Sequence, residues 1–305
     1  MATGSAKRPR YARATRAAPH ASFIAVPNAH SLLPRDPEPK PRRVLITGAA
    51  GFIGRYFVEH APERYELRLM VRPGETVEGR HVVEADLGDL ARLKDVCKGM
   101  DTIVHLAGES SPFAEWMPLL DSNLVGTYNL FVAAKAAGCR RVVYASSIHA
   151  VSGYPEDMQV GPDAPVNPGD LYGVSKCFGE ALARYMAEHE GVSAIAIRIG
   201  AFQKPEWVRN PERIGNMDAW VSQRDLMQLL IRCIDDESIR FAIVNGLSDN
   251  RFNRLDITGA RELLGYAPED RFGDENPGLP NFDQVQTHSL RDGYPSGLRG
   301  ELGDA

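Results

Sequence analysis

Apolar positions along the chain fall into short β-type runs and into longer stretches with the i, i+3, i+4 spacing of an amphipathic helix. The runs that predict strands lie at 43–47, 65–71, 80–84, 101–106, 140–146 and 192–199. The helical patterns lie near 52–61, 89–98, 115–137, 171–190, 222–236 and 256–264. For the last helix, Asp256 is the expected cap and Gly265 the expected stop. This alternation predicts an α/β fold, a doubly wound parallel sheet with helices on both faces.

Both ends of the chain depart from this pattern. Residues 1–41 carry no acidic residue before Asp36 and are rich in proline from 34 onward, which predicts a disordered basic extension or, alternatively, an Arg-rich organellar transit peptide. Residues 269–305 are rich in Gly and Pro and predict an irregular tail. We therefore expect a main domain over 42–200 and a small part packed on it over 201–268, in which the segment 200–220 shows no obvious element.

Composition narrows the class of protein. The 305 residues are 43% hydrophobic, which is enough for a large core. A net charge of −5 gives no reason to expect a nucleic-acid partner, and no apolar run approaches the roughly 18 residues of a membrane span. The four cysteines are far apart and predict small core residues of a reduced compartment. The expected location is cytoplasmic, or organellar if the extension is a transit peptide.

A glycine-rich turn follows the first predicted strand. Gly48 allows a tight turn, Gly51 allows the backbone to approach a pyrophosphate, and Gly54 allows close packing of the next helix. That helix begins at Phe52 and Ile53, and its free N–H groups favour an anion. Together with the second strand at the βαβ distance, the turn predicts a Rossmann-type dinucleotide site in the 42–200 domain.

The second strand ends without the acidic residue that binds the ribose 2′-OH of NAD. The sequence there is Met70-Val71-Arg72-Pro73, and Arg72 can pair with the 2′-phosphate of NADP. We therefore expect NADP as the cofactor, with NAD as the alternative. Further cofactor contacts are expected after the third and fourth strands, from Asp86, Leu87, Leu106, Ala107 and Gly108.

Tyr172 and Lys176 are spaced by one helical turn, and Ser147 ends the fifth predicted strand. Side chains four apart lie on one helix face, so the ammonium can depress the phenol pKa toward the operating pH. The phenolate is then a general base for an alcohol, and the phenol a general acid for a carbonyl. Ser147 is expected to hydrogen-bond the same substrate oxygen.

These features resemble the extended short-chain dehydrogenase/reductase family, also described as NAD-dependent epimerases/dehydratases, over residues 42–268. The motifs that carry the resemblance are Thr47-Gly-Ala-Ala-Gly-Phe-Ile-Gly54, Asp86-Leu87, His105-Leu-Ala-Gly108, Asn123-Leu-Val-Gly-Thr127, Ala145-Ser-Ser147 and Tyr172-x-x-x-Lys176. The resemblance implies that Tyr172 is the proton acceptor and that Lys176 and Ser147 assist it. It also implies that Tyr172, Lys176 and Ile199 contact the cofactor, Lys176 at the nicotinamide ribose.

Within that family the chain is most similar to the uronate dehydrogenase branch, which implies that Ser110 and His149 contact a sugar. The chain departs from the branch at Ile148, Ala201 and Gly215, which replace an Asn, a Ser and the Arg that binds the substrate carboxylate. Arg213 can take the place of that Arg after a small shift.

We expect an oxidoreductase that transfers a hydride between the nicotinamide and a small sugar or sugar acid, at a hemiacetal or secondary alcohol, under the 200–220 segment. One alternative is an NADPH-dependent reductase of a less polar carbonyl compound. A nucleotide-sugar epimerase or dehydratase is disfavoured by the short carboxyl-terminal part, and a non-catalytic NADP-binding sensor by the intact Tyr172 and Lys176. The expected partner is a small-molecule substrate, and homo-oligomerisation stays open.

Overall fold

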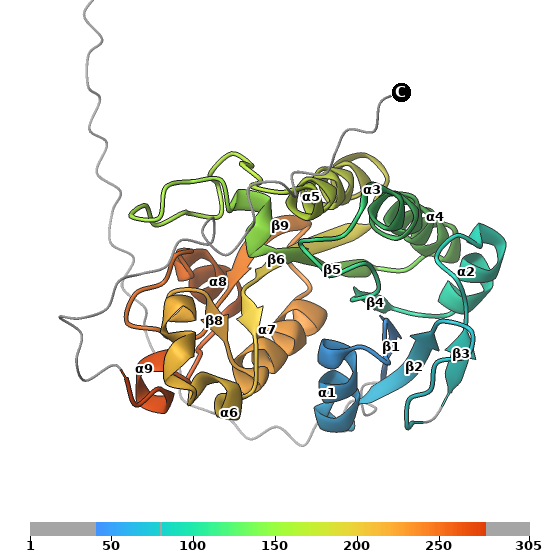
Figure 1. Ribbon diagram of the computed structural model, residues 1–305. Helices are drawn as coiled ribbons and strands as arrows, with labels where there is room; N and C mark the ends of the chain where they lie inside the picture. The colour runs from blue at the N-terminus through green and yellow to red at the C-terminus, as the bar shows by residue number, and fades with distance from the viewer. Residues whose placement is uncertain (1–40, 80, 279–305) are drawn as a thin grey trace, which may run out of the picture. The chain divides into compact units, whose positions relative to one another are not determined.

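The computed structural model describes residues 41–79 and 81–278, and a seven-stranded parallel sheet organises them (Figure 1). The strand order is β3-β2-β1-β4-β5-β6-β9, and every neighbouring pair is parallel. The bounds are β1 Arg42–Thr47, β2 Tyr65–Val71, β3 Val82–Glu84, β4 Thr102–His105, β5 Arg141–Ser147, β6 Ser193–Ile199 and β9 Phe241–Gly246. The predicted fold class is confirmed, and the six predicted strands agree with the structure to within two residues at each end.

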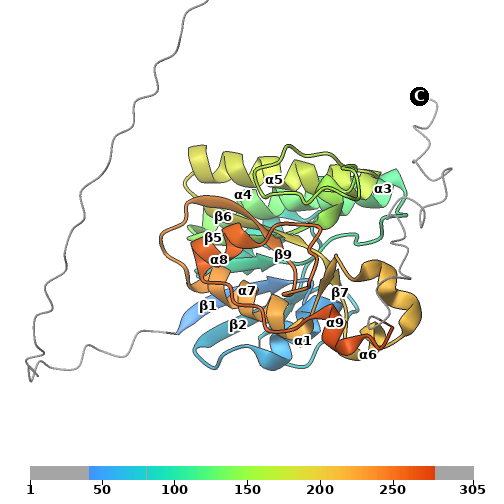
Figure 2. The same ribbon diagram turned by 90° about the vertical axis from the view of Figure 1, so that its left-hand side faces the viewer.

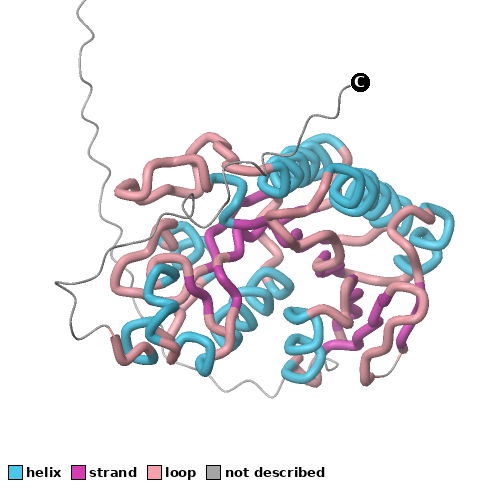
Figure 3. Tube along the Cα trace, viewed as in Figure 1, coloured by secondary structure: helices cyan, strands magenta, loops and turns pink. Residues whose placement is uncertain are grey.

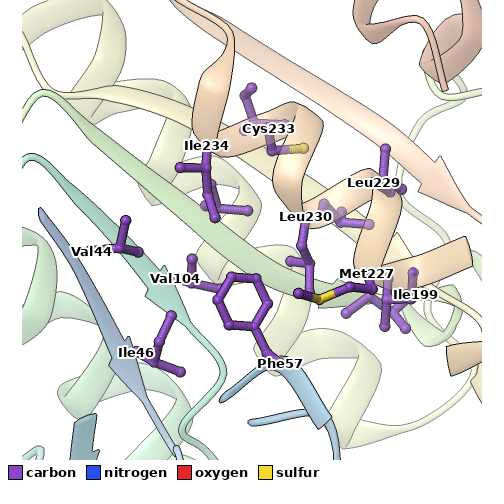
Figure 4. Packing of buried hydrophobic residues seen from close by; sticks show 14 of the residues in the cluster. Val44, Ile46, Phe57, Val104, Ile199, Met227, Leu229, Leu230, Cys233 and Ile234 are labelled. Carbon is purple, nitrogen blue, oxygen red and sulfur yellow. The ribbon is translucent and has the colours of Figure 1, made fainter. Parts of the chain in front are cut away.

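Helices cover both faces of the sheet (Figures 1 and 2). Their bounds are α1 Phe52–His60, α2 Leu90–Cys97, α4 Thr127–Ala137, α5 Leu171–His189, α7 Gln223–Asp235 and α8 Thr258–Leu264. Successive residues of a strand point to opposite faces of the sheet, so a hydrophobic core forms on each face. Val44 and Ile46 pack under α1 and α7, whereas Leu45 packs under α2 and α4. Figure 4 shows the first of these cores, with Phe57 of α1 lying among the strand side chains.

The predicted end signals of α8 are present. The Asp256 carboxylate accepts a hydrogen bond from the Thr258 N–H at 2.9 Å, although Ile257 is the residue that immediately precedes the helix. Gly265 ends the helix with a φ of +63°, a left-handed conformation that glycine adopts without a steric penalty. In the described part of the chain, no helix is long and apolar enough to cross a membrane.

The structure adds elements that the sequence pattern did not reveal. The edge strand β9 follows α7 and pairs with β6, so the βα alternation continues one unit beyond the last predicted strand. The predicted helix over 115–137 consists of α3 Trp116–Pro118, π-helical turns over Leu119–Gly126 and α4. The long connection from Ser152 to Asp170 is traced mainly as loop (Figure 3).

The segment expected to have no obvious element contains several short ones. They are β7 Ala201–Phe202, α6 Pro205–Val208, a 3₁₀ turn Pro211–Asn216 and β8 Trp220–Val221, with β7 and β8 paired in parallel. Two-residue strands carry too little periodicity to be recognised along the sequence. The start of the expected irregular tail also has an ordered part, because Phe272 of α9 Phe272–Glu275 is buried against Trp220. Residues 1–40 and 279–305 of the predicted extension and tail lie outside the described residues.

Candidate active site

The predicted site residues gather at the carboxyl-terminal edge of the sheet. In a parallel sheet every strand ends at the same edge, and ligands of such folds bind in the crevice there. The residues that follow or close strands at this edge are Gly48 after β1, Arg72 after β2, Asp86 and Leu87 after β3, Leu106, Ala107, Gly108 and Ser110 after β4, Ser147 in β5, and Ile199 in β6. Segments up to 151 residues apart in the chain thus contribute to one edge.

The glycine turn after β1 has a shape that tolerates no side chains at two positions. Gly48 has a φ of +66°, and a Cβ there would lie 2.7 Å from the Ala107 nitrogen. A Cβ on Gly54 would meet the Gly48 carbonyl and lie 2.8 Å from the Ala49 Cα. Gly51 precedes α1 with no side chain capping the helix, so the first N–H groups, at Phe52 and Ile53, have no side-chain acceptor. This cradle fits a dinucleotide pyrophosphate.

The end of β2 carries a charge pair that the sequence did not suggest. The Arg72 guanidinium donates to Glu75 Oε1 from Nε at 2.9 Å and from Nη2 at 2.6 Å, and the Arg72 N–H donates to Glu75 Oε2 at 3.2 Å. Arg55 links this loop to the glycine turn, because it donates to the Ala50 and Thr76 carbonyls. Arg72 therefore stands where expected, but a carboxylate three residues later already neutralises it.

Asp86 and Leu87, the expected cofactor contacts after β3, are held by local hydrogen bonds. The Asp86 carboxylate accepts from the Gly88 N–H at 2.7 Å, and the Leu87 carbonyl accepts from the Asn129 amide at 2.9 Å. These contacts fix the turn that follows β3 and leave its backbone in place for a ligand.

A buried network fixes the backbone after β4. Thr47 Oγ1 lies 2.9 Å from His105 Nδ1 and accepts from the Ala107 N–H at 3.2 Å. Burial lowers the pKa of His105 to about 3, so the ring is neutral. Gly108 has a φ of +152° and lies against the Asn123 amide, which accepts from the Glu109 N–H and donates to the Glu109 carbonyl.

Asn123 belongs to one of the family motifs in the sequence, but the motif alone does not indicate its role. Asn123 also donates to Ser175 Oγ at 2.9 Å, and so ties the end of β4 to the first turns of α5. It lies in π-helical turns, which are frequent at functional sites, and such a turn has no simple periodic signal in a sequence.

Tyr172, Lys176 and Ser147 lie together and are almost fully buried. The Lys176 ammonium lies 5.4 Å from the centre of the Tyr172 ring and donates to the Ala145 carbonyl at 3.0 Å. Burial raises the pKa of Tyr172 to about 12, a hydrogen bond with Ser147 lowers it, and Asp170 and Glu109 raise it. Burial lowers the pKa of Lys176 to about 8. In the protein alone, burial therefore outweighs the expected depression of the phenol pKa by the ammonium.

His149 is oriented by a residue that the sequence reasoning missed. Its Nδ1 lies 2.7 Å from Asp170 Oδ2, and its ring meets the Tyr172 ring edge to face at 5.4 Å. The other oxygen of Asp170 accepts from the Gly173 N–H at 2.7 Å and caps α5. An Asp directly before a predicted helix is a capping signal, but that signal does not reveal the contact with His149.

Two predicted substrate residues lie in different surroundings. Both are exposed, Ser110 in the loop after β4 and Arg213 in the 3₁₀ turn. The Arg213 guanidinium also stacks on the Trp207 ring, 4.9 Å from its centre. Arg209, in the same segment, forms an ion pair with Glu275 at 3.1 Å. Ile148, the residue at which the uronate dehydrogenase branch has Asn, is buried among apolar side chains including Val151 and Leu247.

Known proteins are similar to this chain in sequence and in fold. Residues 44–217 match the NAD dependent epimerase/dehydratase family. A uronate dehydrogenase from Agrobacterium fabrum is 37% identical over 75% of this chain and 85% of its own length. An NAD-dependent glucose-6-phosphate dehydrogenase from Haloferax volcanii is 34% identical over 74% of this chain and 93% of its own.

Among solved structures, a uronate dehydrogenase from Agrobacterium tumefaciens complexed with NAD superimposes with a TM-score of 0.70 at 34% identity, over 76% of this chain and 86% of that one. The family match over residues 44–217 covers the glycine turn, the strands of the sheet up to β6 and the helix that carries Tyr172 and Lys176. The chain therefore belongs to the NAD dependent epimerase/dehydratase family.

Proposed function

We propose that this protein oxidises a small sugar or sugar acid at a hemiacetal or secondary alcohol, with a nicotinamide dinucleotide as hydride acceptor. One observation carries the proposal: Tyr172, Lys176 and Ser147 lie buried together at the sheet edge that also holds the glycine cradle. The relatives named for uronate and for glucose 6-phosphate support a sugar as the substrate.

The residues of the chain divide the work between binding and proton transfer. The α1 N-terminus and the turn at Gly48 and Gly51 hold the pyrophosphate, and the cofactor supplies the hydride acceptor when bound. Ser147 Oγ holds the reacting hydroxyl, and the Tyr172 phenolate takes its proton as the C–H hydride leaves. In the reverse direction the protonated phenol donates to the carbonyl oxygen.

The high pKa of the Tyr172 phenol predicts how the rates of oxidation and reduction depend on pH. Since burial keeps Tyr172 protonated at neutral pH, oxidation requires loss of that proton and accelerates as the pH rises, whereas carbonyl reduction does not. In this proposal the His149 ring, which is oriented by Asp170 and packs against Tyr172, contacts the sugar. The segment over 200–220 covers the substrate in this proposal.

NADP is the cofactor that we favour, with NAD as the alternative. Arg72 is the support for this choice, because its guanidinium can form two parallel hydrogen bonds with a 2′-phosphate. The phosphate must then take the place of the Glu75 carboxylate, which is hydrogen-bonded to the Arg72 guanidinium in this structure.

An absorbance assay of the reduced nicotinamide tests the function. Uronates, aldoses, sugar phosphates and hydrophobic ketones are screened in both directions with NAD and NADP, and Tyr172→Phe serves as the inactive control. Turnover of sugars that depends on Tyr172 supports the proposal. Activity confined to the ketones would replace it with the reductase alternative. Cofactor binding without any turnover would indicate a sensor.

A further inference from the structure

Glu109 stands at the candidate active site without a role in the mechanism above. It lies in the loop after β4, four residues beyond His105, and its backbone is fixed on both sides by the Asn123 amide, with hydrogen bonds of 2.8 and 3.0 Å. Its side chain is also fixed, because Oε1 accepts from the Ser110 and Ser111 N–H groups at 2.8 Å each. The second carboxylate oxygen has no hydrogen bond to the described residues. This carboxylate is therefore held in one place and keeps acceptor capacity.

A short series of hydrogen bonds connects Glu109 with the catalytic helix. Asn123 donates to Ser175 Oγ, and Ser175 Oγ donates to the Tyr172 carbonyl at 2.6 Å. The negative charge of Glu109 disfavours the Tyr172 phenolate and so helps to raise the pKa of Tyr172. Ser110, the next residue, is one of the predicted sugar contacts. Glu109 thus belongs to the wall of the site that a substrate must approach.

The charges near this wall are of both signs, because the Lys176 ammonium lies 5.4 Å from the centre of the Tyr172 ring and Arg72, which is paired with Glu75, interacts electrostatically with Glu109. Asp170 raises the pKa of Tyr172 as Glu109 does, but Asp170 is paired with His149. Within the part of the chain that the structure describes, Glu109 forms no ion pair with a Lys, Arg or His side chain. Arg213, the arginine expected to meet an anionic substrate, stacks on Trp207, and Arg209 in the same segment is paired with Glu275.

We propose that the Glu109 carboxylate is a specificity-determining group, which accepts a hydrogen bond from a hydroxyl of a neutral sugar and disfavours sugars that carry a carboxylate or phosphate. The physical reason is that a site discriminates both by pairing the right group and by repelling the wrong one. An anionic sugar meets an unpaired like charge, whereas a hydroxyl meets a fixed acceptor. This inference rests on the proposed function and names its substrate class.

Two sets of three sugars test the proposal, and within each set the sugars differ only in the substituent at C5. The first set is L-arabinose, D-galactose and D-galacturonate, and the second is D-xylose, D-glucose and D-glucuronate. In each set the ring is constant and only the uronate is charged. For the wild-type protein, we expect kcat/KM for the better neutral sugar to exceed that for the uronate by roughly tenfold or more. In Glu109→Gln, this ratio falls by roughly tenfold.

The Gln variant separates charge from structure. A glutamine keeps the Oε1 atom that accepts from Ser110 and Ser111, so the loop keeps its anchor while the charge is removed. Glu115→Gln, an exposed position in the same loop, is the matched control for a change of one unit in net charge, and we expect it to leave the ratio within twofold.

Each outcome has a distinct meaning. Sugar turnover with a ratio unchanged by Glu109→Gln overturns the role of Glu109 and leaves the proposed function intact. A wild-type preference for the uronates also overturns it. No turnover of any of the six sugars, with cofactor binding retained, overturns this inference, and it overturns the proposed function as well only if the wider screen of aldoses, uronates and sugar phosphates also shows no turnover. A ratio that falls in both Gln variants shows an effect of net charge and removes the assignment to Glu109.

Discussion

Neutralising Glu75 should increase the affinity for NADP and leave that for NAD nearly constant. In the structure, Glu75 holds the Arg72 side chain through two hydrogen bonds to Oε1, and its Oε2 accepts from the Arg72 N–H. The Arg72 side chain is 78% exposed and that of Glu75 33% exposed, so both are accessible to a ligand. A 2′-phosphate therefore competes with this carboxylate for the same guanidinium.

The magnitude follows from two contributions. Breaking an exposed ion pair costs about 0.2–1 kcal/mol. Repulsion between the carboxylate and a nearby phosphate at a solvated surface adds about 1 kcal/mol, reduced by salt. The sum is about 1–2 kcal/mol, so Glu75→Gln should tighten NADP binding roughly tenfold. Arg72→Ala should weaken NADP binding roughly ten- to a hundredfold, because charge-assisted contacts are worth about 1.5–3 kcal/mol.

Calorimetric titration of both cofactors against wild type, Arg72→Ala, Glu75→Gln and the double variant measures these effects. Glu78→Gln, an exposed position in the same loop, is the matched control. The gain in Glu75→Gln should depend on Arg72, so it should be largely lost in the double variant. Equal affinities of the wild type for NAD and NADP would refute the assignment of Arg72. An unchanged NADP affinity in Glu75→Gln would refute the competition between the carboxylate and the phosphate.

Three further predictions concern the catalytic pair and the cradle. Tyr172→Phe should reduce turnover by 10²-fold or more with cofactor affinity within a few fold, and steady-state rates above about a tenth of wild type would contradict the acid–base role. Lys176→Met should weaken turnover and cofactor binding yet raise the free energy of unfolding by up to about 3 kcal/mol at pH 7, since the native ammonium has its pKa lowered from 10.5 to about 8. Below pH 8 both states of the wild type hold this proton, and between pH 8 and 10.5 only the native state releases it. Denaturant titrations should therefore show wild-type stability rising toward that of the variant across this window. Gly54→Ala should destabilise the protein by about 1–3 kcal/mol and abolish cofactor binding, because its Cβ would lie 2.8 Å from the Ala49 Cα, and a rise in Tm would contradict this reasoning.

The sequence by itself determined the features that depend on local spacing. Six strands of the sheet were predicted because alternating or continuous apolar runs reflect burial directly. The turn at Gly48, Gly51 and Gly54 was recognisable because its geometry depends on residues close together in the chain. The pairing of Tyr172 with Lys176 follows from one helical turn. Each of these predictions needs no knowledge of what packs against the element.

The tertiary structure decided everything that depends on contacts between distant segments. β9 is a strand because α7 returns the chain to the open edge of β6, and its short apolar run alone does not reveal this. Ile148 is a core residue because the chain after β5 places it among Val151 and Leu247, which its position in the sequence does not reveal.

Charge pairing was decided in the same way. Arg72 looked free along the sequence, but the turn after β2 brings Glu75 onto its guanidinium. Asp170 orients His149 from 21 residues away, and Asn123 places Glu109 beside α5. Electrostatic interactions act through space, so their partners become known only when the chain has folded and brought them within a few ångströms.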